Sequence, residues 1–294
     1  MVSKVGIAKG AYREENITNA LKLIEPEIRE KINRKKRVII KPNLGFLKYN
    51  LANTKSEAVE AVLKFLGQFY TKKIIIAEST TFGETPQGFK EYGYNELEDK
   101  YNIELVDLND KEDFKDFKIY DGLLKQNISV KVSNLLLKSD FIISICPPKT
   151  HDSVIVTLGI KNVAVAAIKK KDRSKIHQGP KAINLTIAKL AKKLLPSLVI
   201  IDGFEAMEGN GPVYGEKVDL KLALASVDAL SADTIMSIIM GFNPSKIGYL
   251  KYCQDAGLGT IDSLKISILG ENYRKMVRSF KPHHLYNLQL DWEI

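Results

Sequence analysis

The sequence predicts an α/β fold in which a largely parallel sheet lies between layers of helices, in the manner of Rossmann-like proteins. Strand-like and helix-like segments alternate along the chain. Some strand-like runs, such as Ile74-Ile75-Ile76, are wholly apolar, as strands covered on both faces require. We expect residues 1–294 to form a single α/β domain, and the pattern leaves room for a small subdomain.

The first half of the chain supplies most of the expected strands. The first helix, near Glu14–Ile32, is amphipathic because apolar residues recur on one face, and Pro26 would kink it or split it in two. The region Thr80–Tyr94 is rich in Gly and is expected to be a loop. The other elements are strands at Val5–Ala8, Arg37–Lys41, Ile74–Ala77, Ile103–Leu108, Ile128–Val132 and Phe141–Ile145, and a helix at Ser56–Phe69.

The second half continues the alternation. A helix over Ala182–Leu195 ends before Pro196, because the residue that precedes a proline disfavours the helical conformation. The remaining expected elements are strands at Leu198–Ile201, Leu220–Ser226 and Ile266–Leu269, and a helix at Leu230–Met240.

Composition excludes several classes of protein. No apolar run approaches the ~18 residues of a membrane span, and the first residues resemble a strand rather than a signal peptide, so we expect a cytoplasmic location and no membrane. Two cysteines, Cys146 and Cys253, are too few for a disulfide scaffold or an iron–sulphur cluster within the chain.

The net charge of +9 indicates anionic partners without identifying them. Most lysines are dispersed beside acids, a composition that is also typical of thermophile proteins. The dense basic run at Lys169–Arg173 lacks interleaved aromatic residues, so nucleic acid is an unlikely partner.

A candidate site follows from the expected strand at Phe141–Ile145, which ends at Pro147-Pro148 and is followed by polar side chains. In open α/β sheets, ligands bind at the carboxyl ends of the strands. The residues expected there as ligand-binding groups are Lys41, Asn43, Glu78, Ser79, Lys149, Thr150 and Asn162. His151, Lys161 and His177 are the candidates for catalysis, with the histidines serving as proton-transfer groups or metal ligands.

Two further features have both a functional and a structural interpretation. The segment Glu208–Gly215 resembles a glycine-rich loop in which Gly209 and Gly211 would expose N–H groups to an anion, although it lacks the ending of a nucleotide P-loop. Asp202 and Glu208 are candidates for a divalent metal such as Mg²⁺. The structural interpretations are also open, since Asn43 could cap a turn, a single histidine is usually structural, and His283-His284 is expected to be exposed.

The ordered motifs V-I-I-K-P-N-L, I-I-I-A-E-S-T, P-P-K-T-H with T-L-G-I-K-N, I-D-G-F-E-A-M-E-G-N-G-P and A-S-V-D-A-L-S-A-D-T resemble the domain-of-unknown-function 362 family over about residues 38–241. Many relatives carry a ferredoxin-like module, which the cysteine count excludes here. A weaker likeness is to the amino-terminal domain of nickel-pincer lactate racemases, in which a Gly-Gly-x-Lys segment carries the lysine that holds the cofactor. Lys161 has a similar context, but one glycine precedes it instead of two.

Two functional hypotheses remain. The first is an enzyme that binds an anionic small molecule or a phosphorylated cofactor at the carboxyl ends of the strands. The alternative is a non-catalytic cofactor carrier, or an accessory protein for a redox partner, suggested by the ferredoxin modules of relatives and by the basic loop. The sequence does not decide whether the chain is catalytic.

Overall fold

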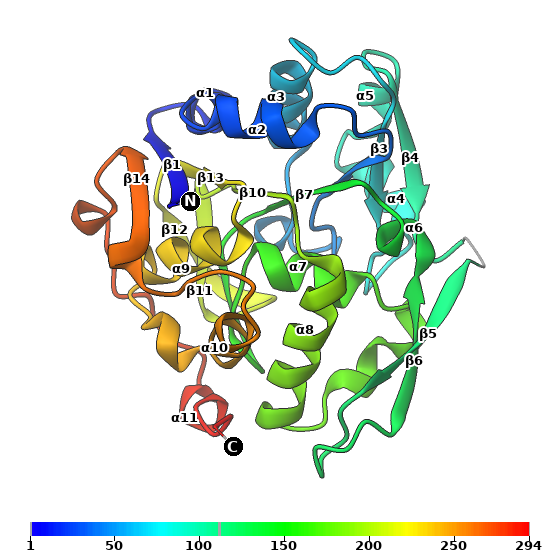
Figure 1. Ribbon diagram of the computed structural model, residues 1–294, viewed down its shortest axis with the longest axis vertical. Coiled ribbons are helices and arrows are strands. Elements are labelled where there is room, and N and C mark those ends of the chain that lie inside the picture. The colour runs from blue at the N-terminus through cyan, green and yellow to red at the C-terminus, as the bar shows by residue number, and fades with distance from the viewer. Residues whose placement is uncertain (1, 111–112, 294) are drawn as a thin grey trace.

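The computed structural model describes residues 2–110 and 113–293, and an eight-stranded sheet forms its centre (Figure 1). The strands lie across the sheet in the order β14 (Ile266–Gly270), β1 (Ser3–Lys9), β13 (Leu222–Ser226), β10 (Leu198–Ile201), β7 (Phe141–Cys146), β2 (Val38–Lys41), β3 (Ile74–Glu78) and β4 (Ile103–Asp107). Within the described residues, β13 is the one strand of this sheet that runs against the other seven, because it pairs antiparallel with β1 and β10. The predicted α/β fold with a largely parallel sheet is confirmed.

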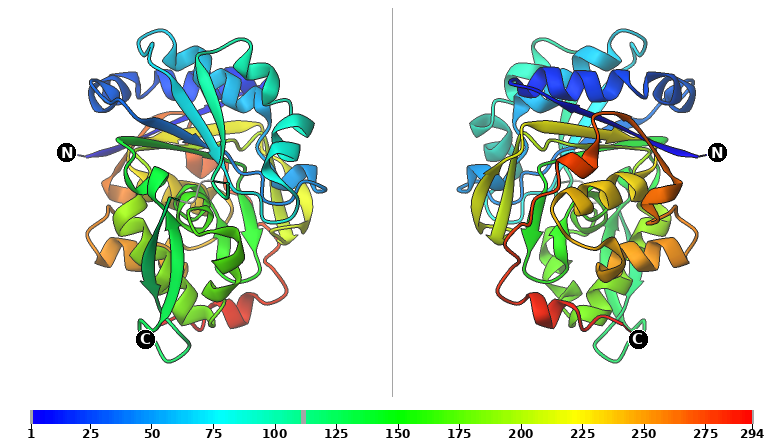
Figure 2. Two further views of the ribbon diagram at one scale, coloured as in Figure 1. Left: turned by 90° about the vertical axis from the view of Figure 1, so that its right-hand side faces the viewer. Right: turned by 90° about the vertical axis from the view of Figure 1, so that its left-hand side faces the viewer.

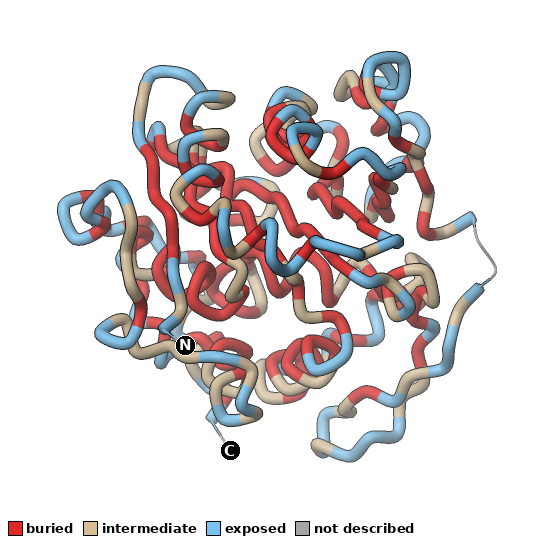
Figure 3. The backbone as a smooth tube through the Cα atoms, turned by 45° about the horizontal axis from the view of Figure 1, so that its top comes forward, coloured by how far each residue is buried: buried red, intermediate tan, exposed pale blue. Residues whose placement is uncertain are grey.

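Helices cover both faces of this sheet (Figures 1 and 2). One layer consists of α1 (Arg13–Lys22), α2 (Glu25–Ile32) and α3 (Ser56–Leu66), and the other of α7 (Gly159–Ala166), α8 (Pro180–Leu194), α9 (Ala229–Ile239) and α10 (Gly248–Asp255). Side chains alternate between the layers along each strand, so Val38 and Ile40 join one core and Ile39 joins the other. Figure 3 shows the buried strands at the centre of the molecule, with exposed segments around them.

The predicted helix at Glu14–Ile32 is two helices, α1 and α2, which is one of the two effects expected of Pro26. Pro26 lies in the first turn of α2, where its missing N–H would have had no partner within the helix. The two helices can therefore follow the same face of the sheet without a helical hydrogen bond being lost at the proline.

The expectation of a loop over Thr80–Tyr94 is wrong, because this region contains α4 (Thr85–Glu91), and α5 (Asn95–Glu98) follows it. Pro86 occupies the first turn of α4, where proline is favoured. Gly88 is a packing glycine, since a Cβ atom there would lie 2.7 Å from Cδ2 of Leu47. Pro86 therefore favours the start of a helix, and Gly88 lets that helix pack closely against Leu47.

The glycine-rich segment is also not the loop that we expected. It forms most of a hairpin between β11 (Glu205–Asn210) and β12 (Tyr214–Asp219), in a second sheet completed by β8 (Lys149–His151) and β9 (Ile155–Thr157). A Cβ atom on Gly211 would lie 2.2 Å from the carbonyl oxygen of Thr150, and one on Gly215 would lie 2.3 Å from that of Glu208. Both glycines therefore permit close approach of one backbone to another.

A third, two-stranded sheet pairs β5 (Phe114–Ile119) with β6 (Ile128–Ser133) and projects from the edge of the molecule (Figure 1). The strand predicted at Ile128–Val132 is thus present, outside the central sheet. The remaining short helices are α6 (Asn134–Leu137) and α11 (Tyr286–Gln289). Over the described ranges, every helix is too short or too polar to cross a membrane.

Candidate functional site

A cavity of about 680 Å³ opens at the carboxyl ends of β2 and β3, beside β8 and α7. Strand-end position brings most of the sequence-predicted site residues to its wall, as expected for an open α/β sheet. Those that line it are Lys41, Asn43, Glu78, Ser79, Lys149, His151, Lys161, Asn162, His177 and Gly211.

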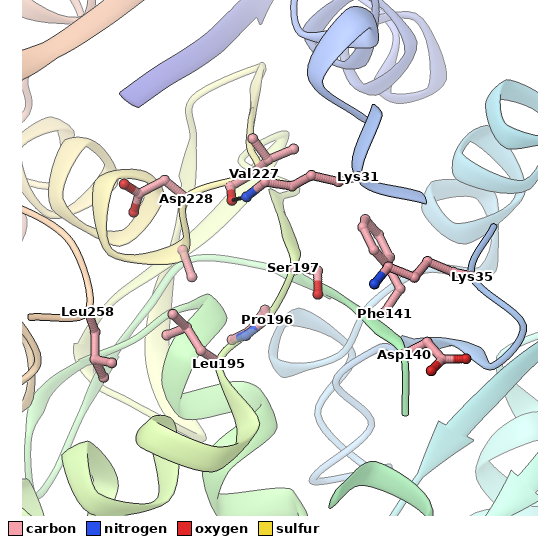
Figure 4. A pocket seen from close by; sticks show the side chains of 11 residues that line it. Lys31, Lys35, Asp140, Phe141, Leu195, Pro196, Ser197, Val227, Asp228 and Leu258 are labelled. Carbon is pink, nitrogen blue, oxygen red and sulfur yellow. Dashed lines mark hydrogen bonds between the residues drawn. The ribbon is translucent and has the colours of Figure 1, made fainter. Parts of the chain in front are cut away.

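Another cavity, of about 410 Å³, lies at the opposite edge of the sheet, where Figure 4 shows Lys31 beside Val227. Two of its polar side chains already form hydrogen bonds with the backbone. The Nζ atom of Lys31 donates to the carbonyl of Val227 at 2.8 Å, and the carboxylate of Asp140 accepts from the backbone N–H of Arg37 at 2.8 Å. We therefore place the candidate site in the larger of these two cavities, where Lys149 and Lys161 are buried without a carboxylate partner in residues 2–110 and 113–293.

A buried ion pair forms the floor of the site. The Nζ atom of Lys41 lies 2.7 Å from Oε1 of Glu78, and both side chains are almost fully buried. The Glu78 carboxylate also accepts the backbone N–H groups of Leu44 and Ser79, each at 2.6 Å. Burial lowers the pKa of Lys41, and Glu78 opposes that shift. This pair ties the ends of β2 and β3 together at the cavity.

Lys149 and Lys161 are buried in the wall without an anionic partner. Lys149 Nζ donates to the carbonyl of Ala52 at 2.9 Å, and Lys161 Nζ reaches the hydroxyl of Thr157 at 3.4 Å. Among the described residues, neither ammonium lies within 4.0 Å of a carboxylate. Burial lowers the pKa of Lys149 to about 8 and that of Lys161 to about 7, and the charge of Lys149 adds to the effect on Lys161.

Lys161 and Asn162 stand on α7, a helix that the sequence did not reveal. Its amino end is held by the buried carboxylate of Asp233, which accepts from the N–H groups of Gly159 at 2.8 Å and Ile160 at 3.0 Å. Burial raises the pKa of Asp233 to about 7, against the effect of these two donors. Asn162 donates to the carbonyl of Lys41 at 3.1 Å, so α7 is joined to the end of β2.

Replacing Asp233 with Ala should destabilise the protein by about 3 kcal/mol, because two buried N–H groups would lose their acceptor. Urea denaturation measures this loss. Asp228→Ala is the matched control, since Asp228 caps α9 through the N–H of Ser231 at 3.0 Å and is less buried. Its cost should be nearer 1 kcal/mol, as is typical of a helix cap. Equal losses in the two variants would contradict the special role of Asp233.

His151 is neutral and held in one orientation. Its Nδ1 atom lies 3.0 Å from the backbone N–H of Ser153 and 3.0 Å from Oδ1 of Asp152. Burial lowers its pKa to about 3, and the nearby Lys161 lowers it further in the same direction. His177 is exposed on the cavity wall, with Nδ1 3.4 Å from the hydroxyl of Ser153. The two predicted histidines therefore line the same cavity, one inside and one in contact with solvent.

Arg173 is a site residue that we did not predict, because the basic run to which it belongs was considered for nucleic acid and for a redox partner. Its guanidinium is buried and donates to the carbonyls of Ser79 at 2.9 Å and Ile168 at 3.1 Å. A 3₁₀ helix over Lys170–Ile176 turns it inward together with Ile176. The three-residue spacing of Arg173 and Ile176 is the one signal that pointed inward.

His283 was also missed, since the sequence suggested an exposed pair. His283 is buried, its ring centroid lies 4.3 Å from that of His284 with the planes tilted by 31°, and both residues line the cavity. Conversely, Asn43 does both things that the sequence left open: its Oδ1 atom accepts the N–H of Gly45 at 3.3 Å within the turn, and the side chain lines the cavity.

Four predicted site residues do not line the cavity. Thr150 donates its hydroxyl to the carbonyl of Gly209 at 2.9 Å, so both residues join β8 to β11. Asp202 pairs with Nε of Arg13 at 3.0 Å, and Glu208 accepts the N–H of Lys281 at 3.0 Å. The two acids expected to bind a metal thus have separate protein partners. In the part of the chain that the structure describes, no group of three potential ligands is arranged for a metal ion.

Comparisons with known proteins give a family and similar proteins, two of which are a thylakoid-associated protein and a lactate racemase apoprotein. The model of the family described as "Domain of unknown function (DUF362)" matches residues 38–237. A thylakoid-associated protein of Synechocystis sp. is 27% identical over 227 residues, which are 76% of this chain and 68% of that protein. The lactate racemase apoprotein of Thermoanaerobacterium thermosaccharolyticum is similar in structure, with a TM-score of 0.48 and 14% identity. That match covers 86% of this chain and 56% of the racemase chain.

Proposed function

Because this chain belongs to the domain-of-unknown-function 362 family, whose name specifies no activity, we propose a function from the site itself. The protein is an enzyme that binds an anionic small molecule, such as a phosphorylated or carboxylated compound, in the cavity at the carboxyl ends of β2 and β3. The observation that carries this proposal is the burial of Lys149 and Lys161 without a carboxylate partner.

The charge balance of the cavity supports an anionic ligand. Burying an unpaired ammonium is strongly unfavourable, so such a group is retained where a ligand neutralises it. The buried cations at the wall are Lys41, Lys149, Lys161 and Arg173, whereas the acids that line it are Glu78 and Asp152. Glu78 is already paired with Lys41 at 2.7 Å. A bound anion would supply the negative charge that this wall lacks.

The same wall holds groups suited to proton transfer. An amine with a pKa of about 7, as for Lys161, accepts or donates a proton readily at neutral pH. The neutral imidazole of His151 lines the same wall, and its Nδ1 atom contacts the N–H of Ser153 and the carboxylate of Asp152. Lys161 is therefore our candidate acid–base group and His151 a hydrogen-bonding group for the ligand, with His177 at the solvent-exposed part of the wall.

Isothermal titration with inorganic phosphate and pyrophosphate near pH 6 tests the proposal. Lys149→Met and Lys161→Met should each weaken binding at least ten-fold, since each removes a buried positive charge. Lys171→Met is the matched control, because it removes the same charge from an exposed residue outside the cavity lining, and its effect should stay within about two-fold. Unchanged affinity in both cavity variants, with their folds intact by circular dichroism, would overturn the proposal.

The alternative of a non-catalytic carrier uses the same cavity without proton transfer. It would be favoured if the protein released a copurified ligand chemically unaltered and if Lys161→Arg bound that ligand with full affinity. A redox partner, a divalent metal and a cytoplasmic location stay predictions from the sequence. The Synechocystis relative is, by its name, a thylakoid-associated protein.

A further inference from the structure

We propose that the mouth of the cavity is a subsite for a planar ring, so that the ligand joins an aromatic heterocycle to its anionic group. This inference rests on the proposed function and adds a ligand class to it. The mouth carries three aromatic side chains that line the same cavity, Phe46, Phe82 and Tyr214. Phe82 and Tyr214 are 65% and 75% exposed, which is unusual for such large apolar surfaces gathered at one site.

The size of the cavity calls for more than a simple anion. At about 680 Å³ it falls in the range of sites for organic ligands, and inorganic phosphate would fill little of it. Its cations are buried, whereas Val165 and Ile176 add apolar wall. A ligand with an anionic end and an apolar body would match both kinds of surface.

Phe82 is held in place although it is exposed. Its ring stacks on Phe46 with centroids 5.0 Å apart and planes at 22°. The backbone fixes this pair, because the N–H of Phe82 donates to the carbonyl of Gly45 at 3.0 Å. Asn53 secures the other member by donating to the carbonyl of Phe46 at 2.8 Å. A preorganised ring surface loses little entropy when another ring stacks on it.

Tyr214 comes from a different part of the fold, at the start of β12. It meets Tyr49 edge-to-face, with centroids 5.3 Å apart and planes at 80°. Gly211, which lies in the same hairpin, brings that backbone against Thr150 and so fixes the position of the hairpin over β8. The cavity mouth therefore has aromatic groups from the loops after β2 and β3 and from the second sheet.

Stacking of a base on an aromatic side chain contributes about 1–3 kcal/mol, which is roughly a 5- to 150-fold gain in affinity. The ring would stack on exposed side chains at the mouth, while its anionic group reaches Lys149 and Lys161. This arrangement needs no glycine-rich phosphate loop, consistent with the absence of a P-loop ending from the sequence.

The test compares organic phosphates that carry an aromatic heterocycle with one that carries none. Titration of the full chain with AMP, flavin mononucleotide and ribose 5-phosphate should show at least one ring compound binding ten-fold or more tightly than ribose 5-phosphate. Phe82→Leu and Tyr214→Leu should remove most of that advantage and leave ribose 5-phosphate binding unchanged. Leu288→Ala, an exposed apolar residue of α11 outside the cavity lining, is the control and should change neither affinity.

The outcomes separate the two proposals. Equal affinities for the ring compounds and ribose 5-phosphate would overturn the ring subsite and leave the anion site standing. A ring advantage that survives both substitutions would also overturn it. Failure of ribose 5-phosphate, inorganic phosphate and pyrophosphate to bind would instead overturn the proposed function on which this inference rests.

Discussion

Replacing Lys41 with Met should lower the free energy of unfolding by about 3–5 kcal/mol, because it leaves the Glu78 carboxylate buried without its counter-ion. The two charged groups lie 2.7 Å apart, and each side chain is no more than 2% exposed. Glu78 cannot turn to solvent, since its oxygens also accept the backbone N–H groups of Leu44 and Ser79. The desolvation of the unpaired Glu78 carboxylate would therefore destabilise the folded state and not the unfolded state.

The double variant separates the charge from the packing. Glu78→Gln removes the charge and keeps one of the two oxygen acceptors of the turn, so Lys41→Met with Glu78→Gln should lose less stability than the sum of the two single changes by about 2 kcal/mol or more. Urea denaturation of the four proteins gives this coupling energy. Lys64→Met is the matched control from an exposed ion pair, Lys64 with Glu14 at 2.9 Å, and should cost within about 1 kcal/mol. Additive losses at Lys41 and Glu78 would show that the buried pair has no special coupling.

The fold was predictable wherever one periodicity dominated a segment. Apolar runs such as Ile74–Ala77 have to be buried on both faces, and this requirement alone placed the central strands. The same requirement did not identify α7. Gly159–Ala166 continues an apolar stretch, and the apolar pattern of a short buried helix is the same as that of a buried strand. The glycines of the β11–β12 hairpin were misinterpreted for a related reason: glycine marks close backbone approach as well as loops.

The site residues that lie at the ends of strands were predictable from the sequence. Lys41, Glu78 and Lys149 reach the cavity because each stands at or just after the end of a strand. Partners from distant segments were invisible, so Asp202 was assigned to a metal although Arg13 neutralises it. Arg173 was left out of the predicted site for the same reason, since only the folded chain supplies the carbonyls that its guanidinium contacts.

The affinity for sulfate should fall as the pH rises from 6 to 9, and this is the largest effect expected at the site itself. Burial lowers the pKa of Lys161 to about 7 and that of Lys149 to about 8, so the free protein loses both ammonium charges within this interval. Above each pKa, binding must first restore a proton, which weakens affinity by up to about ten-fold per pH unit for each lysine. Sulfate is the suitable probe because its charge is constant over this range.

The pH interval of the decline distinguishes Lys149 and Lys161 from His151 as its source. His151, whose pKa is about 3, is already neutral at pH 6, so His151→Gln should leave the pH dependence of sulfate affinity unchanged. Lys161→Met should instead weaken binding at pH 6 and remove the part of the decline that begins near pH 7. An affinity that is constant between pH 6 and 9 would mean that the two lysines do not contact the anion. A decline that Lys161→Met leaves unaltered would assign it to Lys149 alone, and the proton-transfer role would then lose its candidate.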